Sequence, residues 1–428
     1  MMLGMLFGSF FILLALGVPI VFSMGISAGI YYVMSGYPLM QFVQKTIGGV
    51  DSFTLLAIPF FLLAGDIMGK GGISRRMLRF ANALVGPLTG GLAVTGVVSS
   101  AMFGTICGSA PATAASIGGI IAPEMLEKGY SKRFTGSIIA ASGLLGIIIP
   151  PSIVMVNYGA TAGISIGSLF VGGIIPGVMA AAGLALYSIF QSKKNGYGMV
   201  EGHKSHYDAK EIWDSFKGAI LPLTTPLFIM GSIMLGIATA TEAAVISVVW
   251  SAFLTVIVYR EMSVKELCKV TTDGVGKAGQ IIGMMASSAA FGYALTVEKV
   301  PALMANFFVQ YVDSKFVFLL ITFVIVLVFG CFLEVIAIIV LVTPILLPVA
   351  TAMGLDPIHF GMFMCLTLCL GGLTPPVGLC LITTSRIVDT DIDKMFPDLL
   401  HCILIYVAVI ALVGAIPALS TWLPSMMA

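Results

Sequence analysis

The sequence predicts an all-α, polytopic membrane protein in which an inverted repeat builds two re-entrant hairpins and two broken helices. Three observations predict this fold class: sparse charge, long apolar runs, and glycine and proline positions that recur at a fixed offset. Only 10% of the 428 residues are charged and 58% are hydrophobic, whereas soluble domains carry about 25% charged residues. So little charge cannot cover a water-exposed surface of this size, but a lipid environment removes that need.

Apolar runs recur along the whole chain, and many approach the ~20 residues that cross a bilayer. The first run, 5–35, is long enough for two helices. Two others, 88–123 and 316–350, are too long for one crossing and too short for two with a polar loop. Each has small or polar residues in its middle. We therefore expect re-entrant hairpins, whose tips must be buried in protein or line a cavity.

Basic residues cluster on one predicted side of the membrane. Eighteen of the 21 lie in loops at 70–79, 128–133, 193–217, 260–277 and 386–394. The positive-inside rule makes that side cytoplasmic. The first hairpin then opens to the cytoplasm and the second to the outside, and both chain ends are expected outside. The stretches 70–80 and 298–313 are either interfacial amphipathic helices or solvated loops.

A repeat at an offset of 225 residues is the strongest signal. Six helix-breaking residues recur in step, pairing Pro123 with Pro348, Gly129 with Gly354, Gly136 with Gly361, Gly146 with Gly371, Pro150 with Pro375, and Pro151 with Pro376. Repeats usually indicate a fold built twice, and the opposite sidedness of the hairpins indicates inverted copies. Inverted repeats with paired broken helices are typical of secondary transporters.

The paired Pro-Pro sequences predict ion sites. Two adjacent prolines in mid-helix remove two backbone donors and free the carbonyls of the preceding turn. Such carbonyls can bind a cation without formal charge. The alternative is that the prolines only kink their helices, and we favour an ion site because each break follows a matched hairpin.

Composition and motifs exclude several other classes. The net charge of +1 suggests no nucleic-acid partner, and the seven cysteines lack CxxC spacing and are expected to pack as small apolar residues. The first apolar run lacks a basic start, so a cleaved signal peptide is not expected. We find no HExxH, GxSG or phosphate-loop sequence, so neither an enzyme nor an ATP-driven pump is predicted.

Three motifs carry a family resemblance: Gly108 to Ala114, Ile149 to Ser152, and Gly371 to Gly378. Over essentially its whole length the chain resembles the large membrane subunit of the tripartite ATP-independent periplasmic (TRAP) transporters. The resemblance implies uptake of an organic acid, sialic acid or a C4-dicarboxylate, driven by sodium ions through an elevator-type mechanism. It also implies a bacterial inner membrane, a separate small membrane subunit and a periplasmic substrate-binding protein.

With this resemblance, we divide the chain into six segments. Scaffold helices and an interfacial arm occupy 1–87 and, in the second repeat, 218–315. The hairpins and broken helices of the transport domain occupy 88–165 and 316–390. A membrane helix with a cytoplasmic loop spans 166–217, and the last membrane helix lies in 391–428.

The expected sites lie where the hairpin tips meet the breaks. The first sodium site is predicted at Thr105, Ser109, Gly146, Ile149 and Ser152, and the offset places a second at Gly330, Gly371, Thr374 and Val377. A carboxylate substrate between the tips needs hydroxyls, amides and helix N-termini, for which the candidates are Ser109, Thr113, Asn157 and Thr374.

Each candidate has a plainer alternative. The hydroxyls of Thr105 and Ser109 can instead bond to their own helix backbone, and Asn157 can make a purely interhelical hydrogen bond. Glu334, an acid at the second tip, either tunes the second ion site or holds the tip closed. For the whole protein, the alternatives are a proton-coupled permease that needs no binding protein and a passive channel.

Overall fold

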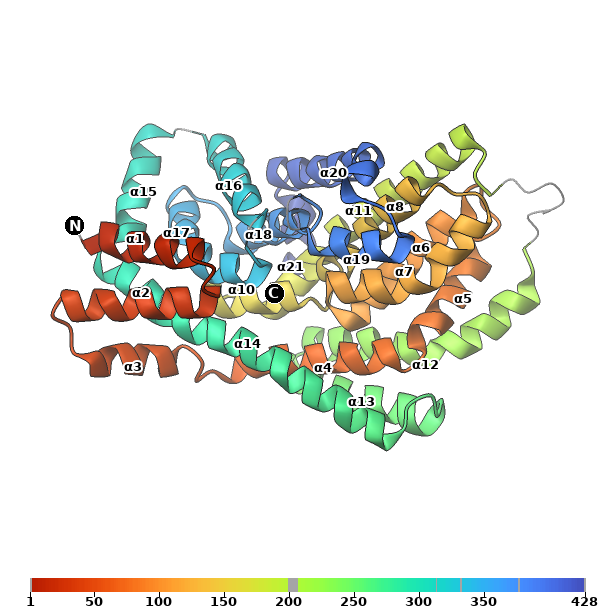
Figure 1. The fold of residues 1–428 in the computed structure, drawn as a ribbon, viewed down its shortest axis with the longest axis horizontal. Coiled ribbons are helices and arrows are strands. Elements are labelled where there is room, and N and C mark those ends of the chain that lie inside the picture. The colour runs from red at the N-terminus through yellow and green to blue at the C-terminus, as the bar shows by residue number, and fades with distance from the viewer. Residues whose placement is uncertain (1, 199–206, 313, 332, 376–377, 427–428) are drawn as a thin grey trace.

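The computed structural model describes residues 2–198, 207–312, 314–331, 333–375 and 378–426, and every regular element in them is helical (Figure 1). The first repeat contains α1 (Met2–Ala15), α2 (Ile20–Met34), α3 (Leu39–Gly48), the 3₁₀ turn η1 (Phe53–Leu56), α4 (Ala57–Lys70), α5 (Ile73–Val85), α6 (Gly91–Cys107), α7 (Ala110–Glu127), α8 (Lys132–Gly143), α9 (Leu145–Ile148), α10 (Ile153–Ala162) and α11 (Ile166–Asn195).

The second half of the chain begins with α12. Its elements are α12 (Ala209–Met234), α13 (Ala240–Ala252) with the π-helical η2 (Phe253–Val258), α14 (Val264–Val297), α15 (Val300–Tyr311), α16 (Lys315–Gly330), α17 (Val335–Ala352), α18 (Pro357–Gly371), α19 (Leu379–Val388), α20 (Ile392–Ala415) and the terminal α21 (Ala418–Ser425).

The prediction of an all-α, polytopic membrane protein is confirmed. In the described residues, seven helices are long and apolar enough to cross a bilayer, and an eighth span results if Lys132–Ile148 and Ile153–Ala162, which meet at 42°, are one broken helix. The run 5–35 forms two helices, as expected. Both mixed stretches contain helices, α5 and α15, rather than loops alone.

Helix boundaries recur at the offset of the sequence repeat. Both limits of α7 and α17 differ by 225 residues, as do the first residues of α8 and α18. The reason is local, because matching positions carry helix starts of similar chemistry. Ser131 caps α8 by accepting from the Phe134 amide at 3.2 Å, and Asp356 caps α18 by accepting from the Ile358 amide at 2.8 Å. The inverted orientation of the two halves in a membrane stays a prediction.

The helices form two groups, which we call central and outer. The central group, α6–α11 with α16–α20, contains both hairpins and both broken helices. Within it α7 packs against α8 and α19, and α10 packs against α17 and α18. Each hairpin therefore contacts the broken helix of the other repeat. The outer group, α1–α4 with α12–α14, is built around the pairs α4–α13 and α2–α14 (Figure 1).

Helices α5 and α15 connect the two groups. Helix α5 packs on α6 of the central group and on α12 of the outer group, while α15 packs on α17 and α14. Ion pairs fix α5 to the outer group: Arg79 binds Glu211 in α12 at 2.7 Å, and Arg76 binds Glu261 beyond η2. Helices α5 and α15 thus contact both groups, which also pack directly on each other where α4 meets α6 and α14 meets α17.

A buried carboxylate joins three helices of the central group. Asp398 in α20 accepts from Arg133 Nε in α8 at 2.5 Å, from the Tyr187 hydroxyl in α11 at 3.2 Å and from Gln191 Nε2 at 3.1 Å. The Tyr406 hydroxyl adds a 2.7 Å bond to the Ala141 carbonyl of α8. These contacts hold α8, α11 and α20 together.

Glycine allows α6 and α9 to approach closely, which gives a first prediction. A Cβ placed on Gly104 would lie 2.5 Å from the Cα of Gly146, so the Gly104→Ala variant meets backbone that cannot move aside. We expect its free energy of unfolding to fall by about 1–3 kcal/mol, seen as a lower Tm in detergent. The matched control is Gly96→Ala on the same helix, where the nearest atom is 3.6 Å away. Equal melting temperatures would contradict this close contact.

A second prediction concerns Asp398. The Asp398→Ala variant leaves three donors without their acceptor, and the half-exposed Arg133 regains water. We expect a loss of about 1.5–3 kcal/mol in the free energy of unfolding. Lys132→Ala, which breaks an exposed pair with Asp389, should cost less than about 1 kcal/mol. Thermal melting of both purified variants checks the difference, and similar shifts would show that the buried network does not stabilise the fold.

Candidate ion and substrate site

The first hairpin turns at Gly108. Helix α6 ends at Cys107, Gly108 adopts a left-handed φ of 62°, and the extended Ser109 precedes α7 as its N-cap residue. A Cβ on Gly108 would lie 3.2 Å from the Pro151 carbonyl oxygen, and one on Gly65 in α4 would lie 2.7 Å from the Cys107 carbonyl. The tip therefore lies between the outer group and the Pro-Pro break.

The Pro-Pro break leaves two carbonyls without their helical donors, and a nearby side chain donates to one of them. Pro150 and Pro151 cannot donate to the carbonyls of Gly146 and Ile147, four residues earlier. The Ser152 hydroxyl takes over one role by donating to the Ile147 carbonyl at 2.6 Å, while it accepts from the Met155 amide at 3.4 Å as the cap of α10. The Gly146 carbonyl has lost its helical donor.

Oxygen atoms converge on Gly146. A Cβ placed there would lie 2.4 Å from the Thr113 hydroxyl oxygen and 3.2 Å from the Ser109 carbonyl oxygen. Thr113 is fully buried, and its hydroxyl has no hydrogen-bond partner in the described part of the chain. The structure therefore brings Ser109, Thr113 and Gly146 together, with uncharged oxygens beside a helix break. The flanking Ile149, half-buried and extended, closes α9.

Two other candidates have side chains tied to their own helices. The Thr105 hydroxyl donates to the Met102 carbonyl at 2.6 Å. Asn157 is fully buried, and its Nδ2 donates to the Ile153 carbonyl at 2.8 Å, whereas its Oδ1 has no partner among the described residues. Asn157 thus keeps one free acceptor, while the Thr105 side chain is already bonded.

The second site repeats the backbone contact but not the side chains. A Cβ on Gly371 would lie 2.9 Å from the Gly330 Cα, which matches the Gly104–Gly146 contact. The Thr374 hydroxyl donates to the Leu370 carbonyl at 2.8 Å, and its amide donates to the Gly371 carbonyl at 3.2 Å. Val377, the remaining candidate, lies outside the described residues.

Glu334 occupies the position in the second hairpin that Ser109 occupies in the first. It is the residue before α17, it is exposed, and its side chain makes no capping hydrogen bond. Within the described ranges, no ion pair includes it. The second tip therefore presents a carboxylate where the first presents a hydroxyl.

Sequence reasoning did not include Gly104 among the site residues, and it missed the packing role of Gly108. These glycines are spaced four apart, and small residues at that spacing allow helices to approach closely in membranes. The GxxxG signal was therefore present in the run 88–123. The contact between Gly65 and the Cys107 carbonyl had no comparable signal, because it joins segments that are 42 residues apart.

The arrangement is suited to hard cations and to anions. Carbonyl and hydroxyl oxygens around an unwound stretch are the ligands that bind sodium in membrane transporters. The N-terminus of α7 begins at the same tip, and helix N-termini favour anions. One small region thus offers both kinds of recognition.

Comparison with known proteins agrees with this architecture. Residues 7–419 match the family model described as "Tripartite ATP-independent periplasmic transporter, DctM component". The chain is 37% identical over 419 residues to the isethionate TRAP transporter permease protein DctMQ of Oleidesulfovibrio alaskensis, covering 97% of this chain and 65% of that protein. It is 35% identical over 426 residues to the sialic acid TRAP transporter large permease protein SiaM of Vibrio cholerae, covering 99% of each.

A solved structure shows the same fold at low identity. The YdaH transporter of Alcanivorax borkumensis superposes with a TM-score of 0.61 and 14% identity, covering 88% of each chain. The curated relatives named above are permeases rather than enzymes. The chain therefore belongs to the tripartite ATP-independent periplasmic transporters, as their DctM component, and is a multi-pass protein of the bacterial inner membrane.

Proposed function

We propose that this chain translocates an organic acid across the inner membrane by sodium-coupled secondary active uptake. The observation that carries the proposal is that each hairpin crosses a broken helix where two glycines meet, at Gly104–Gly146 and at Gly330–Gly371. In the first repeat, this crossing holds the unpartnered Thr113 hydroxyl and the Ser109 carbonyl against Gly146. A sodium ion at this point would join the hairpin tip to the break through neutral oxygens.

The substrate of the proposed reaction is an organic acid. Named relatives carry isethionate and sialic acid, both of which have an acidic group beside hydroxyls. The family resemblance adds the C4-dicarboxylates. The Ser109 tip and the N-terminus of α7 suit the acidic group of such a substrate, and the free Asn157 Oδ1 can accept from a substrate hydroxyl.

Alternating access would move the central group against the outer group, as in an elevator. The division supports this view because α8, α11 and α20 are tied together by Asp398, while the arm helices α5 and α15 lie between the groups. The proposed partners are a separate small membrane subunit and a periplasmic protein that delivers the substrate.

Uptake into proteoliposomes tests the proposal. The chain and its small membrane subunit would be reconstituted, with the binding protein and radiolabelled sialic acid, isethionate or succinate outside. We expect uptake that needs both the binding protein and an inward sodium gradient, and none with a potassium gradient. Uptake without the binding protein, or driven by a proton gradient alone, would instead support the proton-coupled permease. Uptake down the substrate gradient without any ion gradient would support a channel.

A pair of threonine variants tests the ion site. Thr113→Val removes a hydroxyl that has no internal partner, so the sodium concentration for half-maximal uptake should rise by about tenfold, equivalent to ~1.4 kcal/mol. Thr105→Val removes a hydroxyl already bonded to Met102, and its half-maximal sodium concentration should change by less than about twofold. The opposite order would place the ion nearer α6 than α7.

A further inference from the structure

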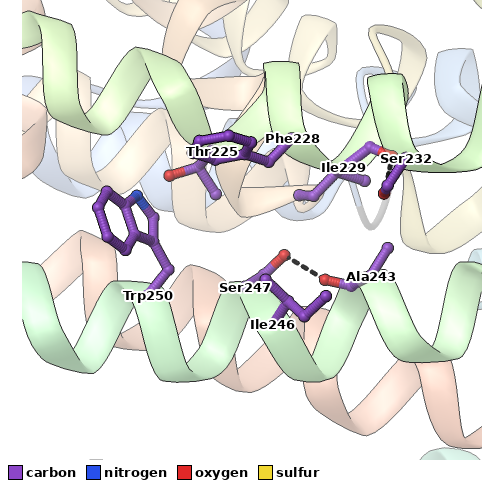
Figure 2. Close-up of a pocket in the computed structure, with 8 residues that line it drawn as sticks. All are labelled: Thr225, Phe228, Ile229, Ser232, Ala243, Ile246, Ser247 and Trp250. Carbon is purple, nitrogen blue, oxygen red and sulfur yellow. Dashed lines mark hydrogen bonds between the residues drawn. The ribbon is translucent and has the colours of Figure 1, made fainter. Parts of the chain in front are cut away.

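A pocket of about 350 Å³ opens between α12 and α13 on the outer group, away from the proposed transport site (Figure 2). Helix α12 contributes Thr225, Phe228, Ile229 and Ser232, and α13 contributes a matching face that includes Ser247 and Trp250. The walls are almost entirely apolar. A side chain or ligand of modest size fits this volume.

Two polar groups in this pocket have no hydrogen-bond partner in the described part of the structure. Thr225 is 2% exposed and its hydroxyl oxygen is unpartnered, as is the buried indole nitrogen of Trp250. The other hydroxyls are satisfied within their own helices: Ser247 donates to Ala243 at 2.7 Å, and Ser232 donates to Ile229 at 3.1 Å. Buried polar groups are nearly always hydrogen-bonded, so the two exceptions indicate a missing partner.

The two unpartnered groups lie at the same end of the pocket. Figure 2 shows the Thr225 hydroxyl turned toward Trp250, whose indole nitrogen lies on the side facing α12, and no hydrogen bond joins them. An indole N–H can only donate, and a hydroxyl can donate or accept. A single oxygen atom seated between them would satisfy both.

Both groups lie well away from the connection between α12 and α13, measured along their helices. Thr225 is nine residues before the end of α12, or about 14 Å along the helix axis, and Trp250 is ten residues after the start of α13, or about 15 Å. The hydrocarbon core is ~30 Å thick. The ester oxygens of a phospholipid lie at the interface, so an acyl chain at this depth brings no acceptor.

The pocket opens toward the surroundings of the protein. Phe228 and Ile246 at its mouth are 56% and 53% exposed, and their neighbours Leu227 and Val249 are also exposed and apolar. Whatever fills the pocket therefore comes from within the membrane. A membrane helix that carries a polar side chain combines an apolar surface with an oxygen atom at the right depth, and such side chains bond across helices.

We propose that this pocket receives an amide or hydroxyl side chain from a membrane helix of the small membrane subunit. The proposal rests on the proposed function, which requires that subunit. The oxygen of the inserted side chain accepts from the Trp250 indole and the Thr225 hydroxyl, while Phe228 and Ile246 cover the helix that bears it.

Photo-crosslinking locates the partner. p-Benzoylphenylalanine replaces Phe228 in the full chain, which is coexpressed with the small membrane subunit in native membranes. We expect a crosslink between the two subunits. The control is the same substitution at Val178 on α11, an exposed apolar site of the central group, which should not crosslink to that subunit. Crosslinking of Phe228 only to phospholipid in the assembled complex would overturn the proposal.

Two conservative variants test the hydrogen bonds. Thr225→Val keeps the shape of the side chain and Trp250→Phe keeps an aromatic ring, while each removes an unpartnered group. Each should raise the dissociation constant of the purified subunits by about threefold. The controls are Thr224→Val, whose hydroxyl already donates to Leu221 at 2.6 Å, and Trp213→Phe at an exposed position. Both should leave the constant unchanged.

The outcomes separate this inference from the proposed function. If the small subunit does not copurify with the unaltered chain, the proposed partnership with that subunit and the pocket proposal both fail. If it copurifies and supports uptake, but the Thr225 and Trp250 variants bind as tightly as the controls, only the pocket proposal is wrong.

Discussion

Contact between bare backbones is the constraint on which the centre of this protein depends. At the Gly104–Gly146 and Gly330–Gly371 crossings, no side chain separates the first limb of a hairpin from the broken helix behind it. In a membrane, helices associate through packing and hydrogen bonds rather than through the hydrophobic effect, so close approach matters more than apolar area. These crossings place the unwound stretches beside the hairpin tips, and the candidate ion and substrate sites follow from that placement.

The breaks require every freed backbone group to find a partner, since lipid offers none. The structure meets this requirement with side chains. The Ser152 hydroxyl donates to the Ile147 carbonyl, which Pro151 leaves without a helical donor. The Tyr259 hydroxyl donates at 3.1 Å to the Gly218 carbonyl, which Pro222 leaves without one. The hydroxyls of Thr113 and Thr225 and the indole nitrogen of Trp250 have no hydrogen-bond partner among the described residues, so these side chains are left with binding capacity.

The sequence predicts much of this fold because its signals are local. Proline pairs, glycines at a constant offset and apolar run lengths depend on neighbouring residues, so the hairpins and breaks could be placed within a few residues. The offset also placed Gly330 and Gly371 in one predicted site, and the structure brings their backbones together. Gly104 was not among the predicted site residues because the prediction concentrated on hydroxyl groups at the tip. The partners of Thr105, Thr374 and Asp398 depend on rotamers and on helices far apart in sequence, which no periodicity reveals.

The two halves share their backbone contacts but differ in the side chains around them. Ser109 and Thr113 of the first repeat correspond to Glu334 and Ile338 of the second, while the glycine crossings remain in both. After an ancestral duplication that kept the glycine crossing, the side chains of the two sites could therefore diverge without repacking of the helices. Helix packing and substrate selectivity then depend on different residues. A protein with this backbone can therefore change its substrate by exchanging a few side chains in one of the two sites.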